Sequence, residues 1–415
     1  MTTELPSEVE VELASEQLGG QSRVGIMRRV GSGPGAIISF AYDRDWIDTR
    51  RAFTIDPSHG LYPGDQFPAH GQIAGIFADA SPDRWGRTLL ERRERLRAEA
   101  ESRRLRALGE WDFLLGVSDR LRMGGLRFVT AAGRYLDDDD DGVPPSARLR
   151  ELEQASRELE DPMHSRQPGA TQRLRLLLAP WASLGGARPK TSFSGEDGAL
   201  WLAKFPSRGD RHDVGACEYL LNELATRARI EVPETRLLRL AGDHRTFAAR
   251  RFDRDGAARR LYASAMTLTG KQDHDEASYL DVTLAIADYG APGYIEADLE
   301  QLFRRVVFNV LTAHRDDHLR NHGFLRSMEG WRLSPAFDLN PVPTLAEHQL
   351  AINDSNRAPD LDVILETASF YRLEPTAARV IADEVREAIR GWREVAQVFE
   401  LTRTDTDLLE SALPA

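Results

Sequence analysis

The sequence contains a single cysteine, Cys217, among its 415 residues. One thiol cannot form an internal disulfide, and it excludes a zinc ribbon built from several cysteines. No run approaches the ~18 apolar residues that a membrane-spanning helix needs. The acidic N-terminal stretch MTTELPSEVEVELASEQLGGQ also lacks the apolar core of a signal peptide. These absences predict a cytoplasmic protein with no membrane partner.

Basic residues are fewer than acidic ones, and the formal net charge is −12. The run Asp137–Asp141 supplies five of these negative charges. An acidic balance argues against a protein that coats nucleic acid without specificity. The arginines between residues 92 and 106 alternate with glutamates, which indicates a solvated helix face rather than a DNA-contacting one.

The chain is long enough for two or three domains, and its pattern predicts an α+β architecture. Short strand-like runs precede residue 136, and helical patterns dominate after about residue 260. Ser81, followed by Pro82, is the predicted N-cap of a helix over residues 81–100. The predicted division is a disordered tail (1–22), a β-rich subdomain (23–136), an acidic linker with a helix (137–165), a mixed lobe (166–256) and a helical lobe (257–415).

The stretch HRDDHLRNHGFL, residues 314–325, concentrates ionisable side chains after an apolar helix. GFLRSMEGWRLSP follows it and predicts a hairpin, whose outer ends should bring Asn321 near Asp338. Asp316, Asn321 and Asp338 then form an oxygen-rich set that suits Mg²⁺. The spacing from His314 to Asn321 fits the protein-kinase pattern H-R-D-x-x-x-x-N, in which the aspartate is the catalytic base and the asparagine holds magnesium. The motif therefore predicts phosphoryl transfer from ATP.

Candidates for the other kinase parts lie upstream. Lys204 ends an alternating strand, where a phosphate-pairing lysine belongs, and Glu218 on the next helix could pair with it. A glycine-bearing turn at residues 183–187 could wrap phosphates with its backbone N–H groups. Arg251, Phe252 and Asp253 fall where a hinge to the adenine is expected.

A metal hydrolase is the alternative interpretation. His314, His318 and His322 have i, i+4, i+8 spacing, and on one continuous helix they would share a face and bind zinc with Asp317. The polar segment and Gly323 instead predict that the helix ends near His314. A non-catalytic, DNA-associated corepressor is a second alternative.

The sequence resembles the HipA family, the serine/threonine kinase toxins of bacterial type II toxin–antitoxin modules. The segments that carry the resemblance are ASPDRWGR (80–87), WDFLLG (111–116), SLGGARPKT (183–191), RRFDR (250–254) and DDHLRN (316–321). The resemblance implies an ATP- and Mg²⁺-dependent enzyme, with a small N-terminal β subdomain beside a bilobal kinase-like core.

Residue roles follow from this resemblance position by position. Asp316 would be the catalytic base, Asn321 and Asp338 the magnesium ligands, and Ser183 the site of inhibitory autophosphorylation. The nucleotide-binding set comprises Ser183, Gly185, Gly186, Ala187, Lys190, Lys204, Glu218, Arg251, Phe252, Asp253 and His318. Arg320 replaces a lysine common in the family and is predicted to take its catalytic role. Arginine keeps the positive charge of that lysine but not its geometry. The implied partners are a small helix-turn-helix antitoxin, DNA through that antitoxin, and a protein substrate; an aminoacyl-tRNA synthetase is one known in the family.

Overall fold

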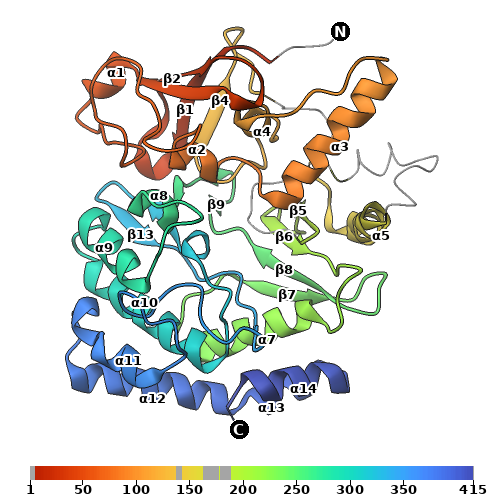
Figure 1. The fold of residues 1–415 in the computed structure, drawn as a ribbon, viewed down its shortest axis with the longest axis vertical. Helices are drawn as coiled ribbons and strands as arrows, with labels where there is room; N and C mark the ends of the chain where they lie inside the picture. The colour runs from red at the N-terminus through yellow and green to blue at the C-terminus, as the bar shows by residue number, and fades with distance from the viewer. Residues whose placement is uncertain (1–4, 137–142, 162–176, 178–187, 415) are drawn as a thin grey trace. The chain divides into compact units, whose positions relative to one another are not determined.

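The computed structural model describes residues 5–136, 143–161, 177 and 188–414 (Figure 1). The chain divides into two compact units. The first comprises Met1–Arg208 with Asp253–Ala263, and the second comprises Gly209–Phe252 with Ser264–Ala415. Both units contain helices and strands, so the predicted mixed α and β architecture is confirmed. Among the described residues, no helix combines the length and apolar character needed to cross a membrane.

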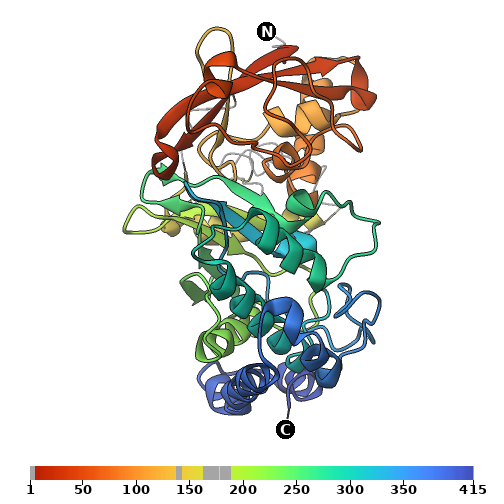
Figure 2. The same cartoon turned by 90° about the vertical axis from the view of Figure 1, so that its left-hand side faces the viewer.

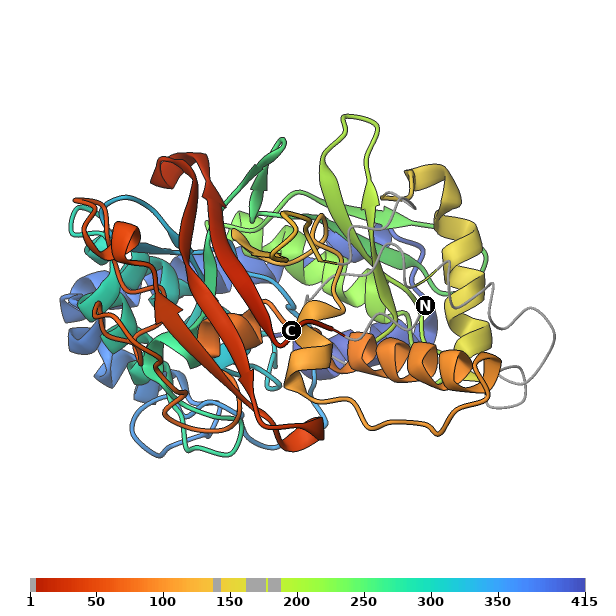
Figure 3. The same cartoon turned by 90° about the horizontal axis from the view of Figure 1, so that it is seen from above.

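The first unit contains an antiparallel sheet of order β3-β2-β1-β4, whose twisted strands β1 to β3 are drawn in red in Figure 3. The strands are β1 (Glu8–Ser15), β2 (Gly20–Val30), β3 (Ile37–Tyr42) and β4 (Leu126–Val129). The prediction of a disordered tail over residues 1–22 is wrong for residues 8–22. Val9, Val11 and Leu13 alternate with glutamates and are buried in the core, so a strand-like period of two lies within the acidic composition.

Helix α3 (Arg84–Ala100) begins later than its sequence predicted. The N-cap is Asp83, whose carboxylate accepts a hydrogen bond of 2.8 Å from the Gly86 N–H, so the assignment of Ser81 as N-cap is wrong. Ser81 instead donates to the Phe77 carbonyl at 2.9 Å. The other elements of this unit are α1 (Arg44–Ile47), α2 (Gly75–Asp79), α4 (Glu110–Leu115), α5 (Leu149–Glu160), β5 (Lys190–Ser194), β6 (Leu200–Lys204), β9 (Arg254–Asp255) and β10 (Ala258–Arg259).

The second unit is mainly helical. Its elements are α7 (Val214–Arg227), β7 (Thr235–Leu238), β8 (Thr246–Arg250), α8 (Ala265–Thr269), α9 (Tyr279–Tyr289), α10 (Ile295–Leu311), β12 (Gly323–Arg326), β13 (Trp331–Leu333), α11 (Leu361–Glu366), α12 (Pro375–Arg390), α13 (Trp392–Gln397) and α14 (Arg403–Ala412). Strand β11 (Tyr262–Ser264) lies where the chain passes from one unit to the other. Helices α12 and α13, in blue, pack against α7, in light green (Figure 2).

The predicted hairpin after the polar stretch is confirmed. Strands β12 and β13 pair antiparallel, with Phe324 opposite Leu333 and Arg326 opposite Trp331. The Gly330 backbone lies so close to that of Ala291 that an added Cβ would approach the Ala291 nitrogen to 2.5 Å. Glycine is therefore required at this turn because of the close backbone approach.

The two units do not coincide with the predicted domains, because β5 and β6 group with the N-terminal segments rather than with residues 209–252. The Trp85 indole N–H donates to the Lys190 carbonyl at 3.2 Å, and the Lys190 ammonium pairs with Asp83 at 2.7 Å. These bonds tie β5 to the start of α3. The predicted acidic linker at Asp137–Asp141 lies outside the described residues.

Candidate active site

The polar stretch at residues 314–322 is a loop in the second unit. Helix α10 ends at Leu311, and a single 3-10 turn, Leu319–Asn321, precedes β12. His314, His318 and His322 therefore do not share a helical face, contrary to the zinc alternative. Within the described ranges, no group of three or more His, Cys, Asp or Glu side chains is arranged to hold a metal ion.

Asp317 fixes this loop in the core of the unit. The Asp317 Oδ2 atom accepts hydrogen bonds from the Tyr279 hydroxyl at 2.8 Å, from Asn309 Nδ2 at 2.8 Å and from His322 Nε2 at 2.9 Å. The four residues are buried, and they come from the start of α9, from α10, and from the loop itself. A buried carboxylate requires such partners, because an unpaired one would be very costly.

The same network shifts the pKa values of Asp317 and Tyr279. Burial opposes ionisation of Asp317, but the charge and hydrogen bond of His322, followed by the His314 charge and the Tyr279 hydrogen bond, outweigh it. They hold the pKa of Asp317 well below its usual value. Burial and the adjacent carboxylate raise the pKa of Tyr279 well above its usual value, so the phenol keeps the proton that it donates.

Asp316, the neighbouring residue, has the opposite environment. Its side chain is exposed, and the Gln349 side-chain amide donates a hydrogen bond to Asp316 Oδ1. The Gln349 backbone N–H donates to the Arg315 carbonyl at 3.0 Å, which aligns the two segments. The loop thus has one anchored carboxylate and one accessible carboxylate at adjacent positions.

Asp338 lies on the segment that follows the hairpin. His314 Nδ1 lies 2.8 Å from the Asn340 carbonyl oxygen, and the Val342 N–H donates to the Ala313 carbonyl at 2.8 Å. The segment that carries Asp338 therefore runs beside the start of the loop. Asp338 (φ 61°) and Ala313 (φ 50°) both adopt the left-handed conformation, which is strained for residues other than glycine and concentrates at functional sites.

Asn321 has a side chain suited to bind a ligand. The residue is 8% exposed, and its backbone N–H donates to the His318 carbonyl at 2.8 Å. Its side-chain amide makes no hydrogen bond to any residue that the structure describes. The amide oxygen is therefore available to a cation, for which it is a suitable hard donor.

His318 and Arg320 are the other two residues of the loop that the sequence assigned to the site. His318 is half-buried at the start of the 3-10 turn, and its Nδ1 atom has no hydrogen-bond partner in the described part of the chain. Arg320 is exposed, and its guanidinium pairs with both carboxylate oxygens of Asp273. The catalytic role predicted for Arg320 therefore stays a prediction.

The two predicted lysines lie on a pair of strands in the first unit. Lys204 is the last residue of β6, is half-buried, and is the register partner of Lys190 on β5. The Lys190 side chain is buried and forms its ion pair with Asp83, which is also buried. Nucleotide binding by either lysine stays a prediction. Ser183, Gly185, Gly186 and Ala187 lie outside the described residues.

The predicted ion-pair and hinge residues occupy both units. Glu218 is buried on α7, and its pairing with Lys204 stays a prediction. Arg251 is buried, and the Phe252 ring lies 5.5 Å from the ring of Phe337, the residue before Asp338. Asp253 is fully buried in the first unit, where it accepts a hydrogen bond of 2.8 Å from the Gly124 N–H. The Asp253 carboxylate therefore has a structural partner.

Sequence reasoning missed two residues that the loop depends on. Asp317 was noted only as a possible zinc ligand, yet Asn309, a polar residue inside the apolar run VVFNVL, was a signal that this helix face has a buried polar partner. Gln349 carried no signal, because it lies in an irregular segment 33 positions from Asp316.

Two family models match the sequence. The profile of the HipA-like C-terminal domain matches residues 182–393, just over half of the chain, and that of the HipA N-terminal domain matches residues 18–112. No curated protein sequence matches the chain significantly.

Two solved structures resemble the chain. One is HipA from Shewanella oneidensis MR-1, in a complex with HipB and operator DNA. It is 16% identical, has a TM-score of 0.69 and covers 97% of this chain and 94% of its own. That identity supports a shared fold only. The Helicobacter pylori proinflammatory kinase CtkA is 14% identical over 50% of this chain and 95% of its own, and its TM-score of 0.34 is too low to support a conclusion. Because the profiles of both HipA domains match in order along one polypeptide, the protein belongs to the HipA family.

Proposed function

We propose that the protein is a serine/threonine protein kinase with a protein-kinase-like core, which transfers the γ-phosphate of ATP to a protein hydroxyl. The observation that carries the proposal is the pair of adjacent aspartates. Asp317 is buried and anchors the loop, and it leaves Asp316 exposed in the H-R-D-x-x-x-x-N position of a catalytic base. Exposure leaves the Asp316 carboxylate accessible to a substrate, and its place in the motif assigns it the role of base.

Asp316 would act on the attacking hydroxyl. The substrate oxygen forms a bond to the γ-phosphorus, the bond between that phosphorus and the β,γ-bridging oxygen breaks, and ADP departs. The proton of the hydroxyl passes to the Asp316 carboxylate. The Gln349 amide, which donates to Asp316 Oδ1, holds the carboxylate in one orientation and leaves its other oxygen for the substrate.

Magnesium fits the donor chemistry beside Asp316. The Asn321 amide oxygen and the Asp338 carboxylate would hold it, since hard oxygen donors suit this cation. When bound, Mg²⁺ neutralises charge on the phosphates. Residues 183–187, Lys190 and Lys204 would contact the nucleotide. Arg320 would first have to leave Asp273, at a cost of about 1 kcal/mol or less for an exposed ion pair.

Family membership supports a wider biological role. We propose that the chain is the toxin of a toxin–antitoxin pair, acts in the cytoplasm, and contacts DNA through a small helix-turn-helix antitoxin. The Shewanella structure holds HipA together with HipB and operator DNA, which supports such a partnership. Inhibitory autophosphorylation at Ser183 belongs to the same proposal and is tested by mass spectrometry of tryptic peptides from active protein.

The decisive experiment is incubation of the purified chain with γ-labelled ATP and Mg²⁺. We expect incorporation of label that Asp316→Asn abolishes, without a change in melting temperature. Asp288→Asn, an exposed position on α9, is the matched control and should keep full activity. Label in the Asp316→Asn variant, or incorporation that survives removal of divalent cations, would contradict the proposal. Absence of ATP binding with retained antitoxin binding would favour a non-catalytic corepressor.

A further inference from the structure

Arg305 on α10 is buried, and within the described part of the chain it forms no ion pair. Its Nη2 atom donates a hydrogen bond of 2.5 Å to the Ser334 carbonyl, while its Nε and Nη1 atoms have no hydrogen-bond partner among the described residues. Burial lowers the pKa of the guanidinium from 12.5 to about 10, against the charges of Glu231, Asp298 and Asp317. The group therefore stays charged at neutral pH.

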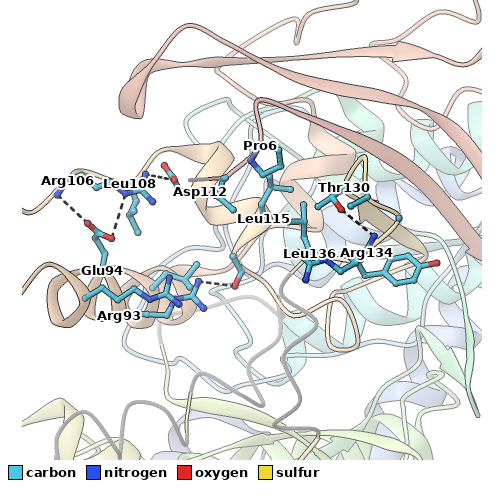
Figure 4. A pocket seen from close by; sticks show the side chains of 17 residues that line it. Pro6, Arg93, Glu94, Arg106, Leu108, Asp112, Leu115, Thr130, Arg134 and Leu136 are labelled. Atoms are coloured by element: carbon cyan, nitrogen blue, oxygen red, sulfur yellow. Dashed lines mark hydrogen bonds and ion pairs between the residues drawn. The ribbon is translucent and has the colours of Figure 1, made fainter. Parts of the chain in front are cut away.

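Two other buried charged groups show the more usual arrangement, in which an opposite charge lies beside them. Arg304, the preceding residue on α10, lies 3.1 Å from Glu300 and 2.8 Å from Glu384. In the pocket of the first unit drawn in Figure 4, the buried Asp112 carboxylate pairs with Arg106 at 2.6 Å. Burial of a charge without an opposite one costs free energy, so stability alone does not explain the Arg305 guanidinium.

Ser334, the acceptor of the Arg305 bond, lies where the segments that carry the two proposed magnesium ligands meet. Its backbone N–H donates to the Gly323 carbonyl at 2.8 Å, and Gly323 follows Asn321 by two positions. Asp338 follows Ser334 by four positions. Because the Arg305 guanidinium binds the carbonyl of the same residue, it holds this junction from the side of α10.

The short segment that leads from this junction to Asp338 is fixed at two further points. The Ala336 N–H donates to the Glu231 carbonyl at 2.7 Å. The Phe337 ring lies 5.5 Å from the ring of Phe252. Asp338 then adopts its left-handed conformation, which persists only where the surroundings enforce it. A displacement at the start of the segment would therefore be transmitted to the Asp338 carboxylate.

We propose that Arg305 is a positioning residue for the magnesium site, because its bond to the Ser334 carbonyl keeps Asn321 and Asp338 in place for one cation. The inference rests on the proposed kinase function, which supplies the cation. Groups that lie behind metal ligands commonly tune metal affinity by fixing the orientation of those ligands. Arg305 would act through the backbone and would touch neither the nucleotide nor the metal.

Binding of Mn²⁺ to the full chain in the presence of a non-hydrolysable ATP analogue tests the proposal, with free Mn²⁺ measured by electron paramagnetic resonance. Mn²⁺ prefers the same oxygen donors as Mg²⁺. We expect Arg305→Met to weaken Mn²⁺ binding about tenfold and to raise the Mg²⁺ concentration for half-maximal label transfer by a similar factor. Arg305→Lys keeps a charged donor and should bind Mn²⁺ within about twofold of the wild type.

Arg304→Met is the matched control, because it removes a buried guanidinium from the same helix, and the partners of that guanidinium are Glu300 and Glu384. It should lower the melting temperature and leave the Mn²⁺ affinity unchanged. Arg305→Gln, which shortens the side chain and removes its charge, is the second variant should Arg305→Met not fold. An unchanged Mn²⁺ affinity in the neutral Arg305 variant, or an equal loss in Arg304→Met, would overturn the proposal.

Label transfer and Mn²⁺ binding together separate the positioning role from the kinase function. Label transfer by the wild type, with an unchanged Mn²⁺ affinity in Arg305→Met, would overturn the positioning role and leave the kinase function intact. Weakened Mn²⁺ binding in Arg305→Met, with no label transfer by the wild type, would support the positioning role and contradict the kinase function. Failure of the wild type to bind Mn²⁺ would contradict both.

Discussion

Substitutions at the two adjacent aspartates of the loop test whether the buried one stabilises the fold and the exposed one serves catalysis. Asp317→Asn keeps the shape of the side chain and removes its charge. Three donors, Tyr279, Asn309 and His322, then meet a neutral oxygen, although a charged acceptor makes bonds about twice as strong. A loss of about 1 kcal/mol for each bond predicts a decrease of about 3 kcal/mol in the free energy of unfolding.

The expected shift in melting temperature follows from the size of the unit. For roughly 200 residues, each kcal/mol lowers the melting temperature by about 2–4 °C, so Asp317→Asn should melt about 6–12 °C below the wild type. Asp316→Asn, at the exposed neighbouring position, should change the stability by no more than about 0.5 kcal/mol. Calorimetry or thermal circular dichroism measures both variants under the same conditions.

Phosphate-transfer activity should rank the two variants in the opposite order to stability. Well below its melting temperature, Asp317→Asn should retain more phosphate transfer than Asp316→Asn, because it lacks only an anchor. The reasoning is refuted if Asp317→Asn melts within about 2 °C of the wild type, since three charge-assisted bonds would then contribute almost nothing. Equal destabilisation by the two substitutions would also refute it.

Two further predictions concern other buried groups. Burial lowers the pKa of His348 from 6.5 to about 4. As the pH falls, the unfolded chain therefore binds a proton at this histidine before the folded chain does. The contribution of this group to the free energy of unfolding is complete above about pH 6.5 and falls by up to about 3 kcal/mol toward pH 4. Melting curves across this range should show a smaller decrease for His348→Gln than for the wild type, and parallel curves would contradict the assignment. Lys190→Met leaves the buried Asp83 carboxylate without its ion-pair partner and should cost about 3–5 kcal/mol. Chemical denaturation measures this change. Arg150→Met, at an exposed position on α5, is the control. An unchanged midpoint for Lys190→Met would show that the pair is not structural.

Several parts of the fold could be predicted because their signals are local. Alternating apolar residues predicted strands such as β6, and the polar segment after the apolar helix predicted that α10 ends before His314. The hairpin of β12 and β13 followed from two short runs around a glycine turn. In each case the deciding residues lie within about ten positions of one another.

The errors arose where local composition and packing disagreed. Acidic residues dominate the N-terminal stretch and suggested disorder, but Val9, Val11 and Leu13 are buried when β1 pairs with β2 and β4. Pairing with two neighbouring strands stabilises a segment that its own composition would not. Ser81 had the expected composition of an N-cap, yet Asp83 caps α3, and its second carboxylate oxygen pairs with Lys190.

The sequence by itself determined the family, the mixed architecture and the spacing that singles out Asp316, Asn321 and Asp338, because these depend on residue types at fixed intervals. It could not determine which of two adjacent aspartates is buried, or that Gln349 holds the other. Those outcomes depend on contacts between α9, α10 and the loop, which are remote in sequence and meet only when the apolar faces of the helices pack together. Tertiary packing therefore decided which carboxylate anchors the loop and which one remains accessible.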